Sequence, residues 1–211
     1  MTSVVPATKW DLSLGTAAVF PSRNGIVRPF ILVGDSAEAA VDPNAFAKEI
    51  DSPSPDYSFR AMLNNASYDL ILVSLSTSDS LDGKAYDSLR SVITRTINYR
   101  NGGEPLTVCG IGRGALQLRY LLARTEAEGI DHQARCFLSY YSTEPSKGEA
   151  AELNRVGSWP RLPRMYEIGI TGDNFNYITS EFDDLITGAR ANRVPLFPDE
   201  LSTNILQKIH N

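Results

Sequence analysis

One glycine-rich stretch in the middle of the chain restricts the possible folds more than any other segment. Residues 106–109 (Leu-Thr-Val-Cys) favour a β-strand, and glycines follow at positions 110, 112 and 114. Apolar residues then recur at positions 116, 118, 121 and 122 with helical spacing. The pattern predicts a strand, a tight turn and a helix, with glycines that let the main chain pass close to another main chain or to a ligand.

Two kinds of site have this layout. One is a dinucleotide-binding loop, Gly-x-Gly-x-x-Gly/Ala, which residues 110–115 match. Such a loop normally follows the first strand, with an acidic residue about 20 residues further on. Here two strand-like runs, 30–33 and 70–73, precede the turn, and Glu126 and Glu128 come too early. The other is a turn that presents a nucleophile between a strand and a helix, and the position in the chain favours it.

Four segments make the second interpretation specific. Residues 28–34, 68–73, 110–123 and 129–139 resemble bacterial α/β-hydrolases of the lipase/esterase type. In those relatives the turn reads Gly-x-Ser-Met-Gly-Gly, and its serine is a nucleophile held in a strained backbone conformation. The resemblance implies an α/β-hydrolase-like fold, which is a doubly wound, mostly parallel sheet with helices on both faces, here with a short cap. The alternation of strands and helices from Ile26 onward predicts the same class.

The other elements follow from periodicity and turn residues. One strand or a bent pair at the sheet edge is predicted over 10–20. Further strands are predicted over 26–33, 68–75, 134–141 and 165–170, and helices or helical turns over 42–54, 59–64, 83–100 and 150–153. For the last part of the chain we predict a helix over 178–191, a last strand over 194–197 and a closing helix over 201–209.

Composition narrows the class of protein. The 211 residues are 42% hydrophobic, which suits a single domain over residues 1–211 with one sizeable core. The formal net charge is −5, so no basic field gathers phosphates, and neither nucleic acid nor a membrane surface is expected as a partner. The N-terminus lacks a charged start followed by an apolar core, and no apolar run reaches about 18 residues. We therefore expect a cytoplasmic protein.

Cysteine and histidine are scarce. Cys109 and Cys136 lie within predicted strands, so we interpret both as small buried hydrophobic residues. The two histidines are scattered, and Asp183 and Asp184 are expected on a solvated helix face, so no metal-ligand spacing is present. No metal and no cofactor are predicted.

The resemblance allows each part of a serine-hydrolase site to be sought. The nucleophile position holds Gly112, which has no side chain. By element order Asp173 matches the acid. The histidine should stand before the final helix, at 198–200, but none is there, and the chain's two histidines, His132 and His210, are expected at the solvated surface. Main-chain donors remain, because the N–H of Arg113 opens a helix and others follow Gly34.

These observations favour a catalytically degenerate α/β-hydrolase-like protein that binds a small acyl- or carboxylate-type ligand or a protein partner. The predicted ligand-binding residues are Gly34, Asp35, Ser36, Ser76, Gly112 and Arg113. One alternative is a non-hydrolytic enzyme, such as an isomerase, cyclase or lyase, in the same pocket. Another is a nucleotide-binding enzyme that uses residues 110–115. A relocated serine centre is a further alternative, and its candidates are Ser36, Ser76, Ser78, Ser139 and Ser142.

Overall fold

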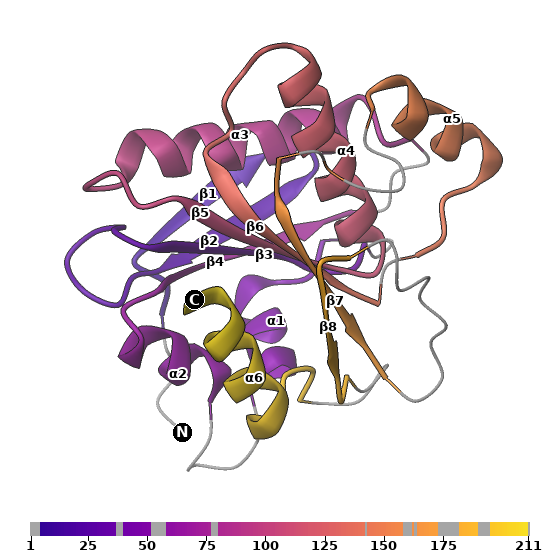
Figure 1. Ribbon diagram of the computed structural model, residues 1–211. Helices are drawn as coiled ribbons and strands as arrows, with labels where there is room; N and C mark the ends of the chain where they lie inside the picture. Colours follow the sequence, from indigo (N-terminus) through magenta and orange to yellow (C-terminus); the bar gives the residue numbers. More distant parts are fainter. Residues whose placement is uncertain are drawn as a thin grey trace.

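A single sheet organises the molecule (Figure 1). The computed structural model describes residues 5–36, 40–51, 58–76, 80–141, 143–157, 162, 164–172, 182–189 and 195–210. The sheet has eight strands in the order β1-β2-β4-β3-β5-β6-β7-β8. They are β1 (Thr8–Leu12), β2 (Gly15–Phe20), β3 (Pro29–Val33), β4 (Asp69–Leu75), β5 (Leu106–Ile111), β6 (Ala134–Tyr140), β7 (Tyr166–Thr171) and β8 (Asp184–Thr187). The pairings of β2 with β1 and with β4 are antiparallel and the other pairings are parallel, so the predicted mostly parallel sheet is confirmed.

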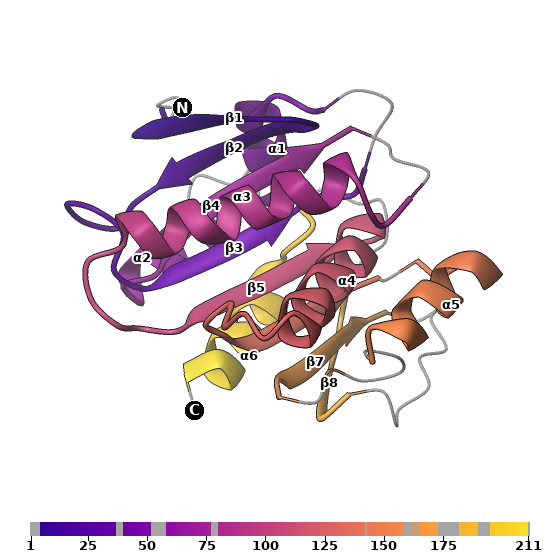
Figure 2. The ribbon, with the colours of Figure 1, turned by 90° about the horizontal axis from the view of Figure 1, so that it is seen from above.

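Helices cover both faces of this sheet (Figures 1 and 2). One face carries α3 (Lys84–Tyr99) and α4 (Arg113–Ala127). The other carries α1 (Pro43–Ile50), α2 (Phe59–Asn65) and α6 (Asp199–His210), while α5 (Lys147–Arg155) lies beside α4. Figure 2 also shows that β3 and β5 end on the side of α5, whereas α6 ends on the opposite side of the sheet.

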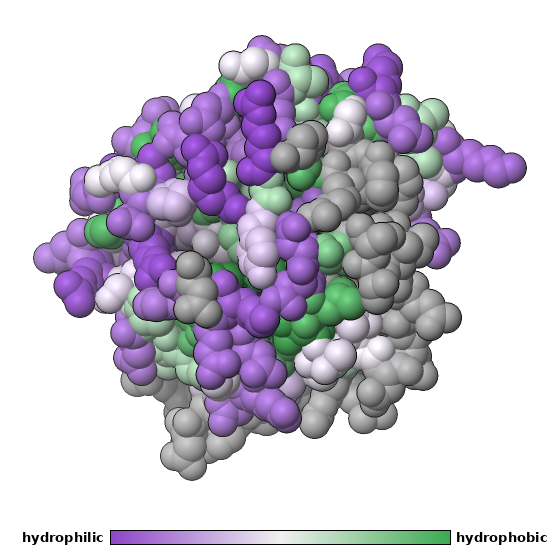
Figure 3. All heavy atoms as spheres, viewed as in Figure 1, coloured by the Kyte–Doolittle hydropathy of each residue, from purple (hydrophilic) through white to green (hydrophobic). Residues whose placement is uncertain are grey.

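The central strands explain why the layers close. Every residue of β3 and β4 is buried, as expected for parallel strands covered on both faces. Successive side chains point to opposite faces. Ile31 and Val33 therefore join the core under α3 and α4, whereas Phe30 and Leu32 join the core under α1, α2 and α6. With the apolar residues divided between these two cores, the surface in Figure 3 is mostly hydrophilic, and its larger apolar area lies beside α6.

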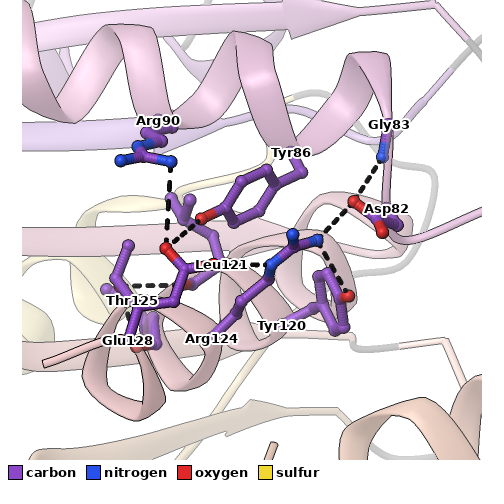
Figure 4. Close-up of polar contacts among 10 residues, drawn as sticks. Asp82, Gly83, Tyr86, Arg90, Tyr120, Leu121, Arg124, Thr125 and Glu128 are labelled. Atoms are coloured by element: carbon purple, nitrogen blue, oxygen red, sulfur yellow. Dashed lines mark hydrogen bonds and ion pairs between the residues drawn. The ribbon is translucent and has the colours of Figure 1, made fainter. Parts of the chain in front are cut away.

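A polar network fixes α3 against α4 (Figure 4). The guanidinium carbon of Arg124 lies 4.3 Å from the ring centroid of Tyr86 and 5.9 Å from that of Tyr120. Arg124 also forms ion pairs with Asp82 and, at 3.0 Å, with Glu128. The cation thus lies among aromatic rings and two carboxylates, an arrangement that ties the two helices together.

The C-terminal part differs from the prediction. The helix predicted over 178–191 is wrong in its described part, because residues 184–187 form β8 parallel to β7. The reason lies in β7, where Gly169 has no side chain: a Cβ there would lie 2.7 Å from Leu185 and 2.9 Å from Phe182. The gap at Gly169 admits both side chains and lets β8 pair with the edge of the sheet.

Two further predictions for this region are wrong. Residues 195–197 of the predicted last strand form no strand; instead Phe197 stacks on Phe59 with a centroid distance of 4.4 Å. Asp184 does not lie on a helix face, because it opens β8 and pairs with Lys208. The last strand therefore precedes the predicted position, and the segment between it and α6 spans residues 188–198.

Candidate functional site

The glycine-rich turn connects β5 directly to α4. Gly112 has φ 54° and ψ −121°, a backbone conformation that side-chain-bearing residues rarely adopt. A Cβ on Gly110 would lie 2.3 Å from the Cα of Ala115, and a Cβ on Gly114 would lie 2.4 Å from the carbonyl oxygen of Gly34. All three glycines are thus required by backbone shape or by close backbone contact. The turn has the sharp strand-to-helix geometry that the sequence predicted.

The carboxylate of Asp35 lies against this turn. Its Oδ1 accepts the main-chain N–H of Arg113 at 2.8 Å and that of Ser36 at 2.9 Å. Its Oδ2 accepts no hydrogen bond from the described residues. A Cβ on Gly112 would lie 2.6 Å from both Cγ and Oδ2 of Asp35, so this carboxylate fills the space in which a nucleophile side chain would begin. The prediction of an open N–H at Arg113 is wrong, since the chain's own carboxylate accepts it.

Polar groups on two helices surround the turn. The guanidinium of Arg113 forms an ion pair with Glu149 of α5, and Glu149 also closes a capping box with Ser146. Burial disfavours the charged form of Glu149, yet Arg113 and the N–H of Ser146 hold its pKa below the usual value. The amide of Gln117 is 1% exposed; its Oε1 accepts the hydroxyl of Ser36 at 3.2 Å. The Nε2 of Gln117 has no hydrogen-bond partner in the described part of the chain.

The structure brings together most of the predicted ligand-binding residues. Those that meet at the start of α4 are Gly34, Asp35, Ser36, Gly112 and Arg113. Ser76 lies apart: it follows β4, and its N–H donates to the carbonyl of Leu14 in the β1–β2 hairpin. The candidate acid Asp173 lies outside the described residues, two positions after β7 ends at Thr171. Sequence reasoning missed Gln117, which lies between Leu116 and Leu118 in the predicted helix.

Of the serine alternatives, the three that the structure describes, Ser36, Ser76 and Ser139, form no hydrogen bond with a histidine. Ser139 is buried in β6, and Ser36 donates to Gln117. Ser78 and Ser142 lie outside the described residues. His132 accepts the N–H of Ala134 at the start of β6, and the ring of His210 contacts that of Tyr68 just before β4. Both histidines therefore lie where the parallel strands begin, whereas α4 starts after the end of β5. The segment between β8 and α6, residues 188–198, contains no histidine in the sequence.

His132 was predicted at the surface, and that prediction is wrong. Its side chain is buried, Nδ1 accepts the N–H of Ala134 at 3.0 Å, and Nε2 lies 3.2 Å from Oε1 of Glu126. The first bond needs the unprotonated Nδ1, so the ring is held neutral with its proton on Nε2. His210, by contrast, is exposed as predicted.

This burial predicts a pH-dependent stability. Burial lowers the pKa of His132, although Glu126 opposes the shift. As the pH falls, His132 therefore binds a proton in the unfolded state at a higher pH than in the folded state. The stability that neutral His132 provides is complete above its unfolded pKa of about 6.5 and is lost as the pH falls below it. We expect urea unfolding of His132→Gln to lose this pH-dependent component, whereas His210→Gln retains it. If the free energy of unfolding changed with pH equally in the parent and in His132→Gln, buried His132 would not be the source of the pH dependence.

Neither cysteine is poised for chemistry. Burial raises the pKa of the Cys136 thiol to about 12, and that of Cys109, which is fully buried in β5, is also raised. Within the described residues, no group of three or more histidine, cysteine or acidic side chains is arranged to hold a metal ion. The helices of the described ranges include none long and apolar enough to cross a membrane.

A concavity lies at the edge of the sheet where the parallel strands begin, opposite the edge at which α4 starts. It has a volume of about 660 Å³, and its lining includes Arg28, Tyr68, Arg135, Tyr166 and Lys208. Two of its cations already have carboxylate partners, because Lys208 pairs with Asp184 and Arg135 lies 3.7 Å from Asp131. Its positive charges are therefore partly compensated by carboxylates of the chain itself.

Comparisons with known proteins agree with the fold. No protein-family model matches the chain, and neither does any curated protein sequence. Among solved structures, the hyperthermophilic esterase of Pyrobaculum calidifontis has a TM-score of 0.63 and 11% identity, covering 99% of this chain and 83% of the esterase. A protein described as a predicted CIB-like hydrolase of Thermoplasma acidophilum has a TM-score of 0.59 and 10% identity, covering 92% of this chain and 93% of that protein.

A third similar structure is much longer than this chain. It is a bifunctional GH43-CE protein of Bacteroides eggerthii, with a TM-score of 0.61 and 8% identity. The match covers 98% of this chain but 38% of that protein. At such identities the likeness concerns the fold alone. The chain has an α/β-hydrolase-like fold.

Proposed function

We propose that this protein binds a ligand at the carboxyl edge of its sheet and does not hydrolyse it. The observation that carries the proposal is Gly112, which retains the elbow's φ of 54° although no nucleophile side chain stands there. A serine centre would also need a histidine after the last strand, and residues 188–198 contain none. The scaffold is retained, whereas the groups that transfer an acyl unit and a proton are absent from these positions.

The group held at the start of α4 indicates which ligand chemistry suits the site. A charged carboxylate accepts a main-chain N–H at a helix N-terminus, where the helix dipole favours negative charge. An acyl or carboxylate group of a small molecule, or of a protein partner, makes the same contacts. Binding of this kind needs donors but no nucleophile, so it fits the residues present.

The nucleotide-binding alternative fits less well. A dinucleotide loop must leave the N-terminus of its helix open to a pyrophosphate. Here the Asp35 carboxylate accepts the N–H of Arg113, and its negative charge would repel a phosphate. The sheet order and the position of the turn after β5 also place it later than the first strand of a βαβ unit.

The proposal predicts that the protein fails as a serine hydrolase. Incubation with a fluorophosphonate probe should give no stoichiometric labelling in intact-protein mass spectrometry, because no serine in the described part of the chain is hydrogen-bonded to a histidine base. Short p-nitrophenyl esters should be turned over no faster than by heat-inactivated protein. An active lipase serves as the positive control. Stoichiometric labelling of one serine would overturn the proposal.

A further inference from the structure

We infer that the start of α4 is a carboxylate-binding site whose resident ligand is the side chain of Asp35, so that a ligand carboxylate binds by replacing Asp35. The inference rests on the proposed function, and it specifies both the ligand class and the residue that controls access. Asp35 comes from the loop after β3, 78 residues before its donor at Arg113. The carboxylate is therefore delivered by the tertiary fold and not by the helix itself.

The first support is the way α4 begins. The N-cap residue is Gly112, and no side chain at that position caps the helix. The 15-residue helix has the positive end of its dipole here, and its first N–H group, that of Arg113, points away from the helix towards Asp35. Asp35 Oδ1 meets the N–H of Arg113 at 2.8 Å, which is the length of a charge-assisted hydrogen bond. The site thus already holds the chemical group that we assign to its ligand.

The second support is independent of the helix terminus. Gln117 lies one turn further along α4 and is 1% exposed, and its Nε2 lacks a partner among the described residues. Its Oε1 is bound to Ser36, so the amide lies against the loop that carries Asp35. A buried donor without a partner costs about 1–3 kcal/mol. Asp35 Oδ1 accepts the N–H of Arg113, while Gln117 Nε2 stays without a partner among the described residues. The carboxylate of a free ligand is not restricted by a tether to the β3 loop, so its two oxygens can be placed towards both donors.

A tethered carboxylate competes strongly with a free one. Linking a group to its site by a short chain gives an effective concentration on the order of millimolar or higher. In addition, a second carboxylate beside Asp35 is disfavoured by like-charge repulsion. The parent protein should therefore bind simple carboxylates weakly, and removing Asp35 should expose the site.

The test measures butyrate binding by ¹⁵N-resolved NMR titration of the full chain. Asp35→Ala should bind butyrate about tenfold or more tightly than the parent, with shifts at the Arg113 N–H and the Gln117 side-chain amide. Asp11→Ala is the matched control, because it removes the same charge from an exposed position on the edge strand β1. It should bind butyrate like the parent.

Two results would overturn the inference. One is a folded Asp35→Ala protein that binds butyrate no more tightly than the parent, which would make Asp35 a helix cap only. The other is tighter binding without shifts at Arg113 and Gln117. If Asp35→Ala does not fold, Asp35→Ser replaces it under the same criteria, because its shorter and neutral side chain also removes the tethered carboxylate. Butyrate has no bond to hydrolyse, so these results are separate from the fluorophosphonate test of the proposed function.

Discussion

Truncating Glu167 to alanine is expected to lower the free energy of unfolding by about 3–5 kcal/mol. The Glu167 side chain on β7 is 0% exposed, and its Oε2 accepts Nη2 of Arg119 on α4 at 2.6 Å. The guanidinium of Arg119 is itself 4% exposed and lies 5.4 Å above the ring of Phe137. Removing the carboxylate leaves a charge in the core without this counter-charge, and such a charge costs more than the pair contributes.

Urea unfolding followed by circular dichroism measures this effect. The double variant Arg119→Met/Glu167→Leu should recover most of the loss, because apolar side chains of similar volume replace both charges. Arg135→Ala is the control: its side chain is 60% exposed, so its ion pair with Asp131 should contribute at most about 1 kcal/mol. A Glu167→Ala protein as stable as Arg135→Ala, or a double variant no better than the single one, would refute the explanation.

The sequence predicted the central sheet because its strands carry their own signal. Strands β3 and β4 are continuous apolar runs, and the helix over 84–99 has a clear apolar stripe. The C-terminal strand lacked such a signal. Phe182, Leu185 and Ile186 have helical spacing, and the deciding contact involves Gly169 on a neighbouring strand. The apolar periodicity of a segment indicates which secondary structure that segment prefers. It gives no information about the space that a glycine on a neighbouring strand leaves open.

The candidate site divides in the same way. The turn at Gly112 was predictable, because glycine spacing and element order are local properties of the chain. The insertion of Asp35 was not, because it depends on a side chain placed by a contact over 78 residues. Burial of His132 was missed for a similar reason: its partner Glu126 is nearby in the chain, but a polar loop before a strand resembles a solvated one.

Replacing Gly112 by serine restores the residue type of the resembling hydrolases but should not create an esterase. We expect the free energy of unfolding to fall by about 1–3 kcal/mol, because a side chain must adopt the φ of 54° that glycine tolerates. The new Cβ would also lie 2.6 Å from Asp35 Oδ2, so the carboxylate has to move. No turnover is expected, since His132 contacts Ala134 at the start of β6 and His210 contacts Tyr68 just before β4, so neither is placed at the turn after β5 to accept the serine proton.

Three variants separate the strain from the collision. Gly112→Ala carries the same backbone penalty without a hydroxyl, so its stability should match that of Gly112→Ser. Gly112→Ser/Asp35→Ala removes the carboxylate that the new Cβ would contact. This double variant should keep only the part of the stability loss that comes from backbone strain at position 112. Gly103→Ser is the control, because a Cβ there meets nothing within 4 Å. Melting temperature and fluorophosphonate labelling are the readouts. If Gly112→Ser had the same melting temperature as the parent, the backbone at Gly112 would be unstrained. The interpretation of the turn as an elbow would then fail, and with it the carboxylate site that depends on the elbow and on the Arg113 N–H.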